Sequence, residues 1–328
     1  MEGTLWRSSH VSSMCSLKHC FTYPDLMKSV LAFYKFFEIE DLHELRLELL
    51  EQGASLELKG TILIAHEGIN STLVGQKKNL EAFSFWLTNR FGSFPFKWSS
   101  AEDSNDVFFR FKVKIKPEIV TMGVSDLDMR SVGRHVSAEE WNEILQDPDV
   151  IVVDARNDYE TDIGGFPGSI IPGTKNFREF PAWADKELND KENKKIAMFC
   201  TGGIRCEKAS AYLMNSGFKD VCQLDGGVLK YLEKVDDKDS RWSGECFVFD
   251  QRVSVDARLQ QGRYNQCFAC RHPLSESDLL SEFYEEGVSC HFCFDNKSQE
   301  RKDQFRQRQK QIQLANERGQ QHLGITKN

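Results

Sequence analysis

The chain has 328 residues, a length that predicts two or three domains rather than one compact core. Its 40% hydrophobic and 28% charged residues are typical of a globular protein and exclude collagen, low complexity and wholesale disorder. The net charge of −8 excludes a broad positive field over the whole molecule, so any nucleic-acid contact must use a local patch.

No stretch of the chain approaches the roughly 18 uninterrupted apolar residues of a membrane-spanning helix, so no membrane contact is expected. Residues 1–27 lack the apolar core of a secretory signal, and we interpret them as a disordered tail. Ten cysteines would suggest disulfides in a small secreted chain, but this chain is large and four of its cysteines form two tight pairs. These features predict a reducing, cytoplasmic compartment.

Residues 28–122 predict a ferredoxin-like, or acylphosphatase-like, domain of the α+β class. Asp41 is placed to cap a helix, because Glu44 follows three residues later and leucines recur at helical spacing behind it; Gly53 is expected to end that helix. Short aromatic and β-branched runs predict the strands. The expected order is β-α-β-β-α-β, with strands at 31–37, 61–65, 71–74 and 107–115, helices at 41–53 and 80–91, and a longer hairpin loop at 66–70.

The last of these strands alternates apolar residues with cations, and a period of two places all the cations on one face. They are Arg110, Lys112, Lys114 and Lys116. Two interpretations stay open: the charges keep a solvated strand from aggregating, or they contact phosphates.

Residues 130–235 predict a second domain, of the α/β class. A Ser137-x-x-Glu140 capping box begins a helix whose apolar face includes Trp141. The apolar runs at 150–153 and 196–199 predict buried strands, and helical segments lie between and after them. This alternation predicts a parallel sheet.

The second buried strand ends at residues 200–205, Cys-Thr-Gly-Gly-Ile-Arg, and a helical pattern follows. A strand, a glycine-rich turn and a helix N-terminus hold anions, because backbone N–H groups turn inward and the helix adds partial positive charge. A sulfur in such a loop is held as a thiolate, and Arg205 adds a permanent cation. Cys200 and Arg205 are therefore the predicted catalytic residues, with a buried structural cysteine as the alternative.

At this loop the chain resembles the rhodanese superfamily, whose active-site cysteine opens a six-residue loop ending in arginine. Cysteine-dependent phosphatases have a loop one residue longer between cysteine and arginine. The shorter loop of this chain therefore favours sulfur over phosphate as the ligand of the family. Three other segments resemble landmarks of the rhodanese superfamily: Asp154-Ala155-Arg156, the segment 168–173, and Asp225-Gly226-Gly227. In the first of them, Asp154 and Arg156 are expected to be structural.

The resemblance narrows when the segment 65–70, Ala-His-Glu-Gly-Ile-Asn, is taken with the loop sequence Cys-Thr-Gly-Gly-Ile-Arg-Cys-Glu-Lys. Both together resemble the rhodanese-like tRNA uridine 34 hydroxylases, over about residues 28–255 and including Phe-Val-Phe-Asp at 247–250. The resemblance implies oxygen-dependent 5-hydroxylation of the wobble uridine. Molecular oxygen would be the co-substrate, and the anticodon region of tRNA the partner.

A chemical hypothesis agrees with the loop and with the resemblance. The Cys200 thiolate adds to C6 of uracil, and the resulting enolate captures oxygen at C5, with Arg205 and the loop amides stabilising the anion or a nearby phosphate. Cys206 is either a resolving thiol for an oxidised Cys200 or, as we expect, a small residue packed in the first helical turn. We find no flavin, haem or two-histidine-one-carboxylate iron signature, and His66 and Glu67 are interpreted as a turn.

The C-terminal region, 236–298, carries Cys267-x-x-Cys270 and Cys290-x-x-Cys293, separated by 19 residues. This spacing is typical of a four-cysteine structural zinc site, which would substitute for the core that so short a polar segment cannot build. Reduced free cysteines are the alternative. His272 and His291 are expected at the surface rather than as ligands. Residues 299–328 predict a solvated basic helix or tail that could touch tRNA phosphates.

Three function classes follow. The preferred one is an enzyme acting on tRNA, in which the N-terminal domain and C-terminal region bind RNA and the rhodanese loop does the chemistry. The second is a sulfurtransferase that carries a persulfide on Cys200 to cyanide, a protein thiol or a base, and the loop chemistry alone favours it. The third, an RNA-binding or zinc-dependent adaptor, is disfavoured by the intact Cys200 and Arg205. No protein partner is indicated.

Overall fold

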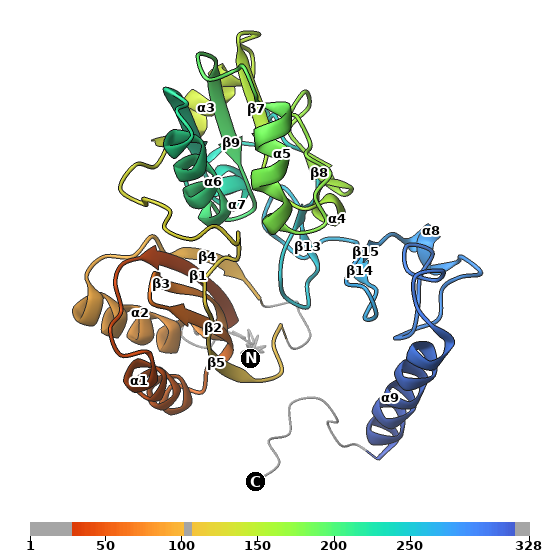
Figure 1. Ribbon diagram of the computed structural model, residues 1–328. Helices are drawn as coiled ribbons and strands as arrows, with labels where there is room; N and C mark the ends of the chain where they lie inside the picture. Colours follow the sequence, from red (N-terminus) through yellow and green to blue (C-terminus); the bar gives the residue numbers. More distant parts are fainter. Residues whose placement is uncertain (1–27, 102–106, 319–328) are drawn as a thin grey trace, which may run out of the picture.

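The computed structural model describes residues 28–101 and 107–318, so the tail expected at 1–27 lies outside the described residues. Three parts follow one another along the chain (Figure 1). They are a mixed five-stranded sheet with two helices, a parallel four-stranded sheet between helices, and a C-terminal region of short two-stranded sheets that ends in a long helix. The predicted fold class, α+β followed by α/β and a small cysteine-rich region, is confirmed.

The first part is a sheet with strand order β4-β1-β3-β2-β5. Its elements are β1 (Lys28–Phe36), α1 (Leu42–Ser55), β2 (Lys59–Ala65), β3 (Gly68–Gln76), α2 (Lys77–Phe91), β4 (Lys97–Ser100) and β5 (Phe111–Ile115). Strands β4, β1, β3 and β2 are antiparallel neighbours, which is the ferredoxin-like arrangement. The strand predicted at 107–115 therefore does not close this unit. Strand β4 closes it, and the shorter β5 adds a fifth strand, parallel to β2, at the opposite edge.

Two local predictions in this domain are wrong. Helix α1 continues two residues past Gly53, to Ser55; Gly53 is a packing position, where a Cβ would lie 2.1 Å from the Phe111 ring. The loop expected at 66–70 is a two-residue turn of His66 and Glu67, since β2 and β3 stay paired along their whole length. The interpretation of these two residues as a turn is confirmed.

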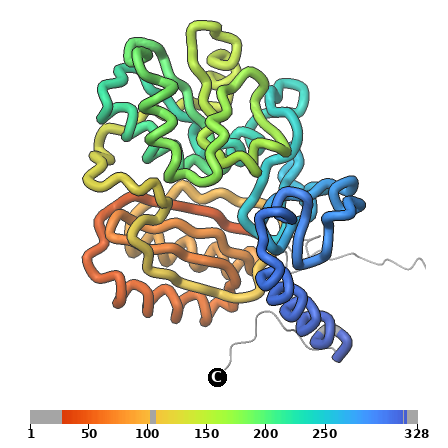
Figure 2. The backbone as a smooth tube through the Cα atoms, turned by 45° about the vertical axis from the view of Figure 1, so that its right-hand side comes forward, coloured from red at the N-terminus to blue at the C-terminus, as the bar shows by residue number. Residues whose placement is uncertain are grey.

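The two faces of this sheet have different environments. Along β1, Leu31 and Phe33 are buried in the core that the sheet forms with α1 and α2. Val30, Ala32 and Tyr34 alternate with them and line a cavity on the other face. Figure 2 shows the two helices beneath the sheet and the second domain above it, so the helix-free face of the sheet is turned toward the second domain.

The second part is the parallel sheet that the sequence predicts, with strand order β6-β10-β9-β7. Its elements are β6 (Arg134–Val136), α3 (Ala138–Ile144), β7 (Val150–Asp154), α4 (Asp158–Thr161), β8 (Gly164–Gly165), a 3-10 turn (Phe177–Glu179), α5 (Phe180–Glu187), β9 (Lys195–Phe199), α6 (Ile204–Asn215), β10 (Asp220–Leu224) and α7 (Gly227–Lys234). Trp141 of α3 and Tyr231 of α7 are buried on one face of the sheet, and α5 and α6 cover the other. Ser137 caps α3, but the carboxylate of Glu140 binds Arg134 at 2.6 Å instead of completing the capping box.

The C-terminal region is built from short elements. They are β11 (Ser243–Gly244), which pairs with β8, then β12 (Cys246–Phe247) with β13 (Ser254–Val255), β14 (Asn265–Gln266) with β15 (Pro273–Leu274), α8 (Glu276–Leu279) and α9 (Gln299–Glu317). The basic segment that begins at residue 299 is thus a helix over most of its length, and Phe305 and Lys302 pack its inner face. Within the described ranges, no helix has both the length and the apolar character needed to cross a bilayer.

Candidate active site

Cys200 lies between the end of β9 and the N-terminus of α6, at the start of the predicted loop. Its Sγ accepts a hydrogen bond from the backbone N–H of Gly203 at 3.1 Å. The first turn of α7 supports the loop from behind, because the backbone N–H of Val228 donates to the Cys200 carbonyl at 3.0 Å. Gly227 is required at this contact: its φ is +68°, and a Cβ there would lie 2.4 Å from the Cys200 carbonyl oxygen.

The surroundings of Cys200 favour its thiolate form. The side chain is fully buried, and burial by itself opposes ionisation. A hydrogen bond from the Cys206 thiol, the charge of Arg205 and backbone N–H groups of both residues outweigh burial and lower the pKa of Cys200 to about 5. Burial and the adjacent Cys200 charge raise the pKa of Cys206 well above its usual value, so Cys206 stays a thiol and donates. The loop therefore holds a nucleophile that is ionised at neutral pH.

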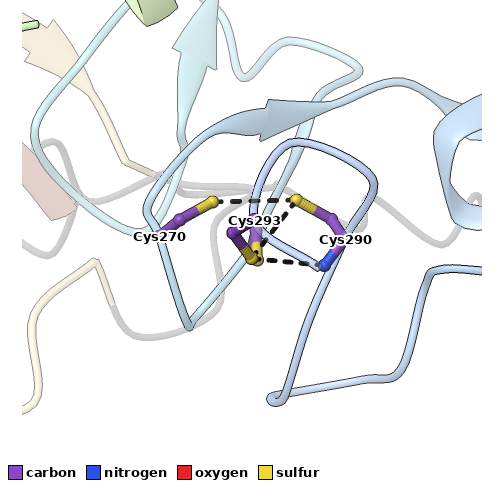
Figure 3. Close-up of side chains that lie close together, drawn as sticks. Cys270, Cys290 and Cys293 are labelled. Atoms are coloured by element: carbon purple, nitrogen blue, oxygen red, sulfur yellow. Dashed lines mark hydrogen bonds between the residues drawn. The ribbon is translucent and has the colours of Figure 1, made fainter. Parts of the chain in front are cut away.

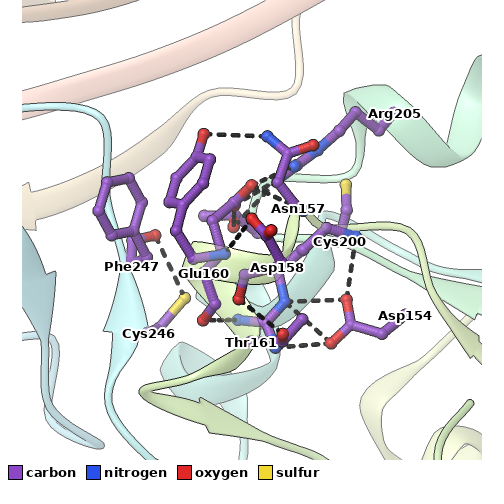
Figure 4. Close-up of polar contacts among 12 residues, drawn as sticks. Asp154, Asn157, Asp158, Glu160, Thr161, Cys200, Arg205, Cys246 and Phe247 are labelled. Atoms are coloured by element: carbon purple, nitrogen blue, oxygen red, sulfur yellow. Dashed lines mark hydrogen bonds and ion pairs between the residues drawn. The ribbon is translucent and has the colours of Figure 1, made fainter. Parts of the chain in front are cut away.

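The guanidinium of Arg205 is bound by a carboxylate that the sequence analysis did not identify (Figure 4). Two nitrogens of Arg205 donate to Glu160 at 2.5 and 2.7 Å, and Thr201 Oγ1 donates to the same carboxylate at 3.0 Å. Glu160 is fully buried and the Arg205 charge, acting against burial, holds its pKa below the usual range. Arg205 thus affects Cys200 through its positive charge, which favours the thiolate, while two of its N–H donors are occupied by the Glu160 carboxylate. The sequence signal was the Asn157-x-x-Glu160 capping box of α4, which predicts a helix start but no ion pair.

Asp154 and Arg156, expected to be structural, are both buried in the second domain. Arg156 donates to the Asp154 carboxylate at 2.6 Å and to the carbonyl of Gly164 at 2.6 Å. Its guanidinium also lies 4.9 Å from the centroid of the Trp242 ring. These contacts fix the segment after β7 that carries Glu160, which supports the structural interpretation.

A cavity of ≈ 640 Å³ lies between the helix-free face of the N-terminal sheet and the Cys200 loop. This volume falls within the roughly 300–1,000 Å³ of small-molecule sites. Its polar and aromatic lining includes Tyr34, Asn70, Lys97, Lys114 and Lys116 from the N-terminal domain, Cys200, Thr201 and Arg205 from the loop, and Phe249, Asp250 and Arg252 from the segment after the second domain. Two of the four predicted cations, Lys114 and Lys116, are therefore part of the cavity wall.

Phe249, from the predicted 247–250 segment, lies at the rim of this cavity. It is 58% exposed, and its ring centroid is 5.7 Å from the guanidinium carbon of Arg205. The following Arg252 pairs with Asp250 and donates across the domain boundary to Ser99 Oγ of β4 at 2.9 Å. The segment thus ties the edge of the N-terminal sheet to the cavity.

The motif around Glu67 holds the two domains together. Glu67 lies 2.8 Å from the buried Nζ of Lys208 on α6 and accepts from the backbone N–H of Ile119 at 2.6 Å. Asn70 donates to the carbonyl of Ile119 at 3.0 Å, and Glu118 binds the same ammonium of Lys208 at 2.5 Å. The sequence could not predict this role, since the partners come from a different domain and from the connecting segment.

The four C-terminal cysteines converge, as their spacing predicts. Figure 3 shows three of them, Cys270, Cys290 and Cys293, with their sulfur atoms turned toward one another. Their sulfur atoms all lie within 4.8 Å of one another, with separations of 3.9 Å for Cys267–Cys293 and 3.7 Å for Cys270–Cys290. Zinc–sulfur bonds of about 2.3 Å in a tetrahedron place neighbouring sulfurs about 3.8 Å apart. The donor set and the spacing therefore fit a four-thiolate zinc ion.

The two nearby histidines are not part of the cysteine cluster. His272, which was expected at the surface, is partly buried: its side chain is 19% exposed and stacks on Phe292 at a centroid distance of 3.9 Å. It also packs edge-on against Tyr159 of α4, at 5.9 Å, which attaches the cysteine-rich unit to the second domain. The His291 ring is tilted against the same Phe292 ring, at a centroid distance of 3.9 Å.

Comparison with known families agrees with this architecture. Residues 28–119 match the UPF0176 acylphosphatase-like domain, and residues 137–234 match the rhodanese-like domain. The two matches together span more than half of the 328 residues, in the order found in rhodanese-like tRNA uridine hydroxylases. The chain belongs to this UPF0176 family. The resemblance that the sequence motifs predicted is confirmed.

Solved structures show partial likeness to this UPF0176 member. A rhodanese-like domain protein from Staphylococcus aureus is 25% identical and covers 30% of this chain and 90% of its own, with a TM-score of 0.25. The Alr3790 protein from Anabaena sp. is 18% identical, covers 33% and 91%, and has a TM-score of 0.28. A single-domain sulfurtransferase from Saccharomyces cerevisiae is 17% identical, covers 31% and 91%, and has a TM-score of 0.27. Each likeness covers about a third of this chain.

Proposed function

We propose that this UPF0176 member is an oxygen-dependent enzyme that hydroxylates C5 of the wobble uridine, position 34, of tRNA. The observation that carries the proposal is the place of Cys200, a thiolate in the wall of a cavity that both matched domains build together. The rhodanese-like domain alone would leave this sulfur beneath an open surface. The N-terminal sheet supplies the facing wall and makes a pocket of a size suited to a nucleobase.

The proposed chemistry begins with addition of the Cys200 thiolate to C6 of uracil. The sulfur–carbon bond forms as the C5–C6 double bond opens, which makes C5 nucleophilic. One atom of molecular oxygen then becomes the 5-hydroxyl, and an external two-electron reductant converts the other atom to water. Removal of the C5 proton by a base and loss of the Cys200 thiolate from C6 then restore the double bond. The Arg205 charge and the loop amides keep Cys200 ionised before each addition.

An unstacked anticodon base is the part of tRNA that can enter such a pocket. Phe249 is exposed at the rim and offers a ring on which a neighbouring base can stack. Lys114 and Lys116 bring positive charge to the cavity wall, which favours the phosphate-contact interpretation of the predicted row of cations. The basic helix α9 is a further surface for the RNA backbone.

The four cysteines have a structural role in this proposal. A zinc ion held by Cys267, Cys270, Cys290 and Cys293 would organise a region whose apolar core is small. With four protein ligands, it would have no open position for chemistry. The packing of His272 against Tyr159 couples this unit to the domain that carries the Cys200 loop.

A sulfurtransferase is the second candidate function. The observation that favours it is the loop itself, because a buried thiolate followed by inward-pointing amides can also carry a persulfide sulfur. In that case Cys200 would take sulfur from a donor and pass it to an acceptor nucleophile, without oxygen. Both functions need Cys200, so the product and not the residue distinguishes them.

The test is to incubate tRNA lacking wobble modifications with the protein under labelled oxygen gas and a thiol reductant. High-resolution mass spectrometry of the nucleosides separates oxygen insertion from exchange of oxygen for sulfur, which have almost the same nominal mass. We expect labelled oxygen in uridine 34 with the parent protein and with Cys222→Ala, and none with Cys200→Ser. Cys222 is a buried thiol of β10 and serves as the matched control. Sulfur without label would establish the sulfurtransferase instead.

A further inference from the structure

Strand β4, the edge strand that the sequence analysis did not predict, places a lysine in the cavity wall opposite the Cys200 loop. Lys97 begins β4 and is paired with Ala32 of β1. Its side chain lines the cavity together with Cys200, and the whole residue is only 8% exposed. Its Nζ lies 4.6 Å from the centroid of the Tyr34 ring, which is a cation–π contact.

Within residues 28–101 and 107–318, Lys97 differs from the other buried cations around the site because no carboxylate pairs with it. Arg156, Arg205 and Lys208 each lie within 3 Å of an acidic side chain, as does Arg252. Among the described residues, Lys97 has neither an ion pair nor a hydrogen bond from its ammonium group; the Tyr34 ring is its close contact. Burying a charge without a partner is unfavourable, so the site is built to receive an anion at this position.

The charges that face Lys97 come from four other elements. Burial lowers its pKa, whereas the charge of Cys200 raises it, and the balance is a pKa of about 8. The remaining charged neighbours have smaller effects: Asp225 and Glu207 raise the pKa, and Lys230 lowers it. Lys97 is therefore mostly protonated at neutral pH and can give up its proton readily, as an acid catalyst must.

We propose that Lys97 is the catalytic acid of the N-terminal domain, which donates its proton to O4 of the target uracil as Cys200 Sγ bonds to C6. This inference rests on the proposed function. Addition at C6 moves the electron pair of the C5–C6 double bond toward O4, and the oxygen takes the proton from Nζ, leaving neutral Lys97 and a neutral enol. The reverse transfer accompanies loss of the thiolate. No oxidant or reductant takes part in this step.

Arg205 is less suited to this donation; the sequence predicted for it only the stabilisation of the anion or of a nearby phosphate. Its paired donors already bind Glu160, and its proton cannot be given up. Lys97 has free donors and stands on the wall facing the sulfur. The geometry therefore divides the roles: Arg205 keeps Cys200 ionised, and Lys97 protonates O4 as negative charge develops on the base.

The test isolates the addition step with tRNA that carries 5-fluorouridine at position 34. Attack by Cys200 gives a protein–RNA adduct that survives denaturing electrophoresis and needs neither oxygen nor reductant. We expect Lys97→Met to slow adduct formation by about 100-fold or more, within the range typical of a lost acid catalyst. We expect Lys78→Met, at an exposed lysine of α2 on the far side of the sheet, to leave the rate unchanged.

The pH profile separates Lys97 from a merely structural residue. With the parent protein the rate of adduct formation should rise through about pH 5, as Cys200 ionises, and fall through about pH 8, as Lys97 loses its proton. Lys97→Arg keeps the charge, so it should retain part of the rate and lose the fall near pH 8. Lys97→Met should melt at or above the temperature of the parent, because it removes an unpaired buried charge.

Three outcomes would overturn the inference. One is adduct formation by Lys97→Met within threefold of the parent rate. The second is a loss of rate that is matched by an equal loss of Cys200 alkylation by iodoacetamide, which would mean that Lys97 acts only on the thiol. The third is the absence of any adduct with the parent protein itself, which would refute the proposed addition at C6 as well.

Discussion

The ion pair between Arg205 and Glu160 gives the sharpest stability prediction. Glu160→Gln removes the negative charge and keeps the shape, which leaves a buried guanidinium without a counter-charge. Glu160 is 0% and Arg205 is 6% exposed, so solvent does not screen the loss. Removing one partner of such a pair costs about 3–5 kcal/mol of the free energy of unfolding. For a domain of this size, that corresponds to a melting temperature lower by at least ~10 °C.

The assay is differential scanning calorimetry of the full chain, in which the transition of the second domain is followed. Glu143→Gln is the matched control, because Glu143 is an exposed residue of α3, and it should change stability by less than about 0.5 kcal/mol. Adding Arg205→Met to Glu160→Gln should recover part of the loss, since the unpaired charge is then gone. A loss below about 1 kcal/mol for Glu160→Gln alone would mean that the ion pair does not stabilise the second domain.

Three further predictions concern the loop and the metal site. Alkylation of Cys200 by iodoacetamide should reach half of its maximal rate near pH 5, because the thiolate is the reactive form and its pKa is lowered; half-maximal rate near pH 8.5, as for an ordinary thiol, would contradict the assignment. Gly227→Ala should abolish tRNA hydroxylation by displacing the Cys200 carbonyl, whereas Gly202→Ala, whose Cβ meets no atom within 4 Å, should fold with unchanged stability in the same thermal assay. Purified protein should contain one zinc per chain by atomic emission, and Cys270→Ser should lower both the zinc content and the melting temperature; full zinc content in that variant would contradict the four-thiolate site.

The fold was predictable where the hydrophobic pattern within a single segment determines its secondary structure. The buried runs at 150–153 and 196–199 are strands because they are apolar throughout, and the alternation of cations with apolar residues at 111–115 matches β5. Strand β4 was not predictable in the same way. It has four residues, two of them serine, and it is defined by pairing with β1 more than sixty positions earlier in the chain. The helix end expected at Gly53 was wrong by two residues, and the contact of this glycine with Phe111, from a distant strand, could not be predicted from the local sequence.

The parts of the site whose residues lie close together in the sequence were predictable. Cys200 with its glycines, and the two cysteine pairs near the C-terminus, are local patterns whose physical consequences follow from spacing. Glu160 and Lys97 were missed because each acts through a partner on another element. Glu67 was recognised only as part of a turn, and its interaction with Lys208 depends on how the domains pack. Residue type alone does not show which charge will be paired.

The most direct measurement of the central claim is peptide mapping of the adduct formed with 5-fluorouridine tRNA. The complex is digested with protease and ribonuclease, and the linked peptide is sequenced by mass spectrometry. We expect the nucleotide to be attached to the peptide that contains Cys200, and the linked nucleotide to come from position 34. Attachment at another residue, or a Cys200 peptide that carries only an extra sulfur atom while the tRNA stays unlinked, would contradict it.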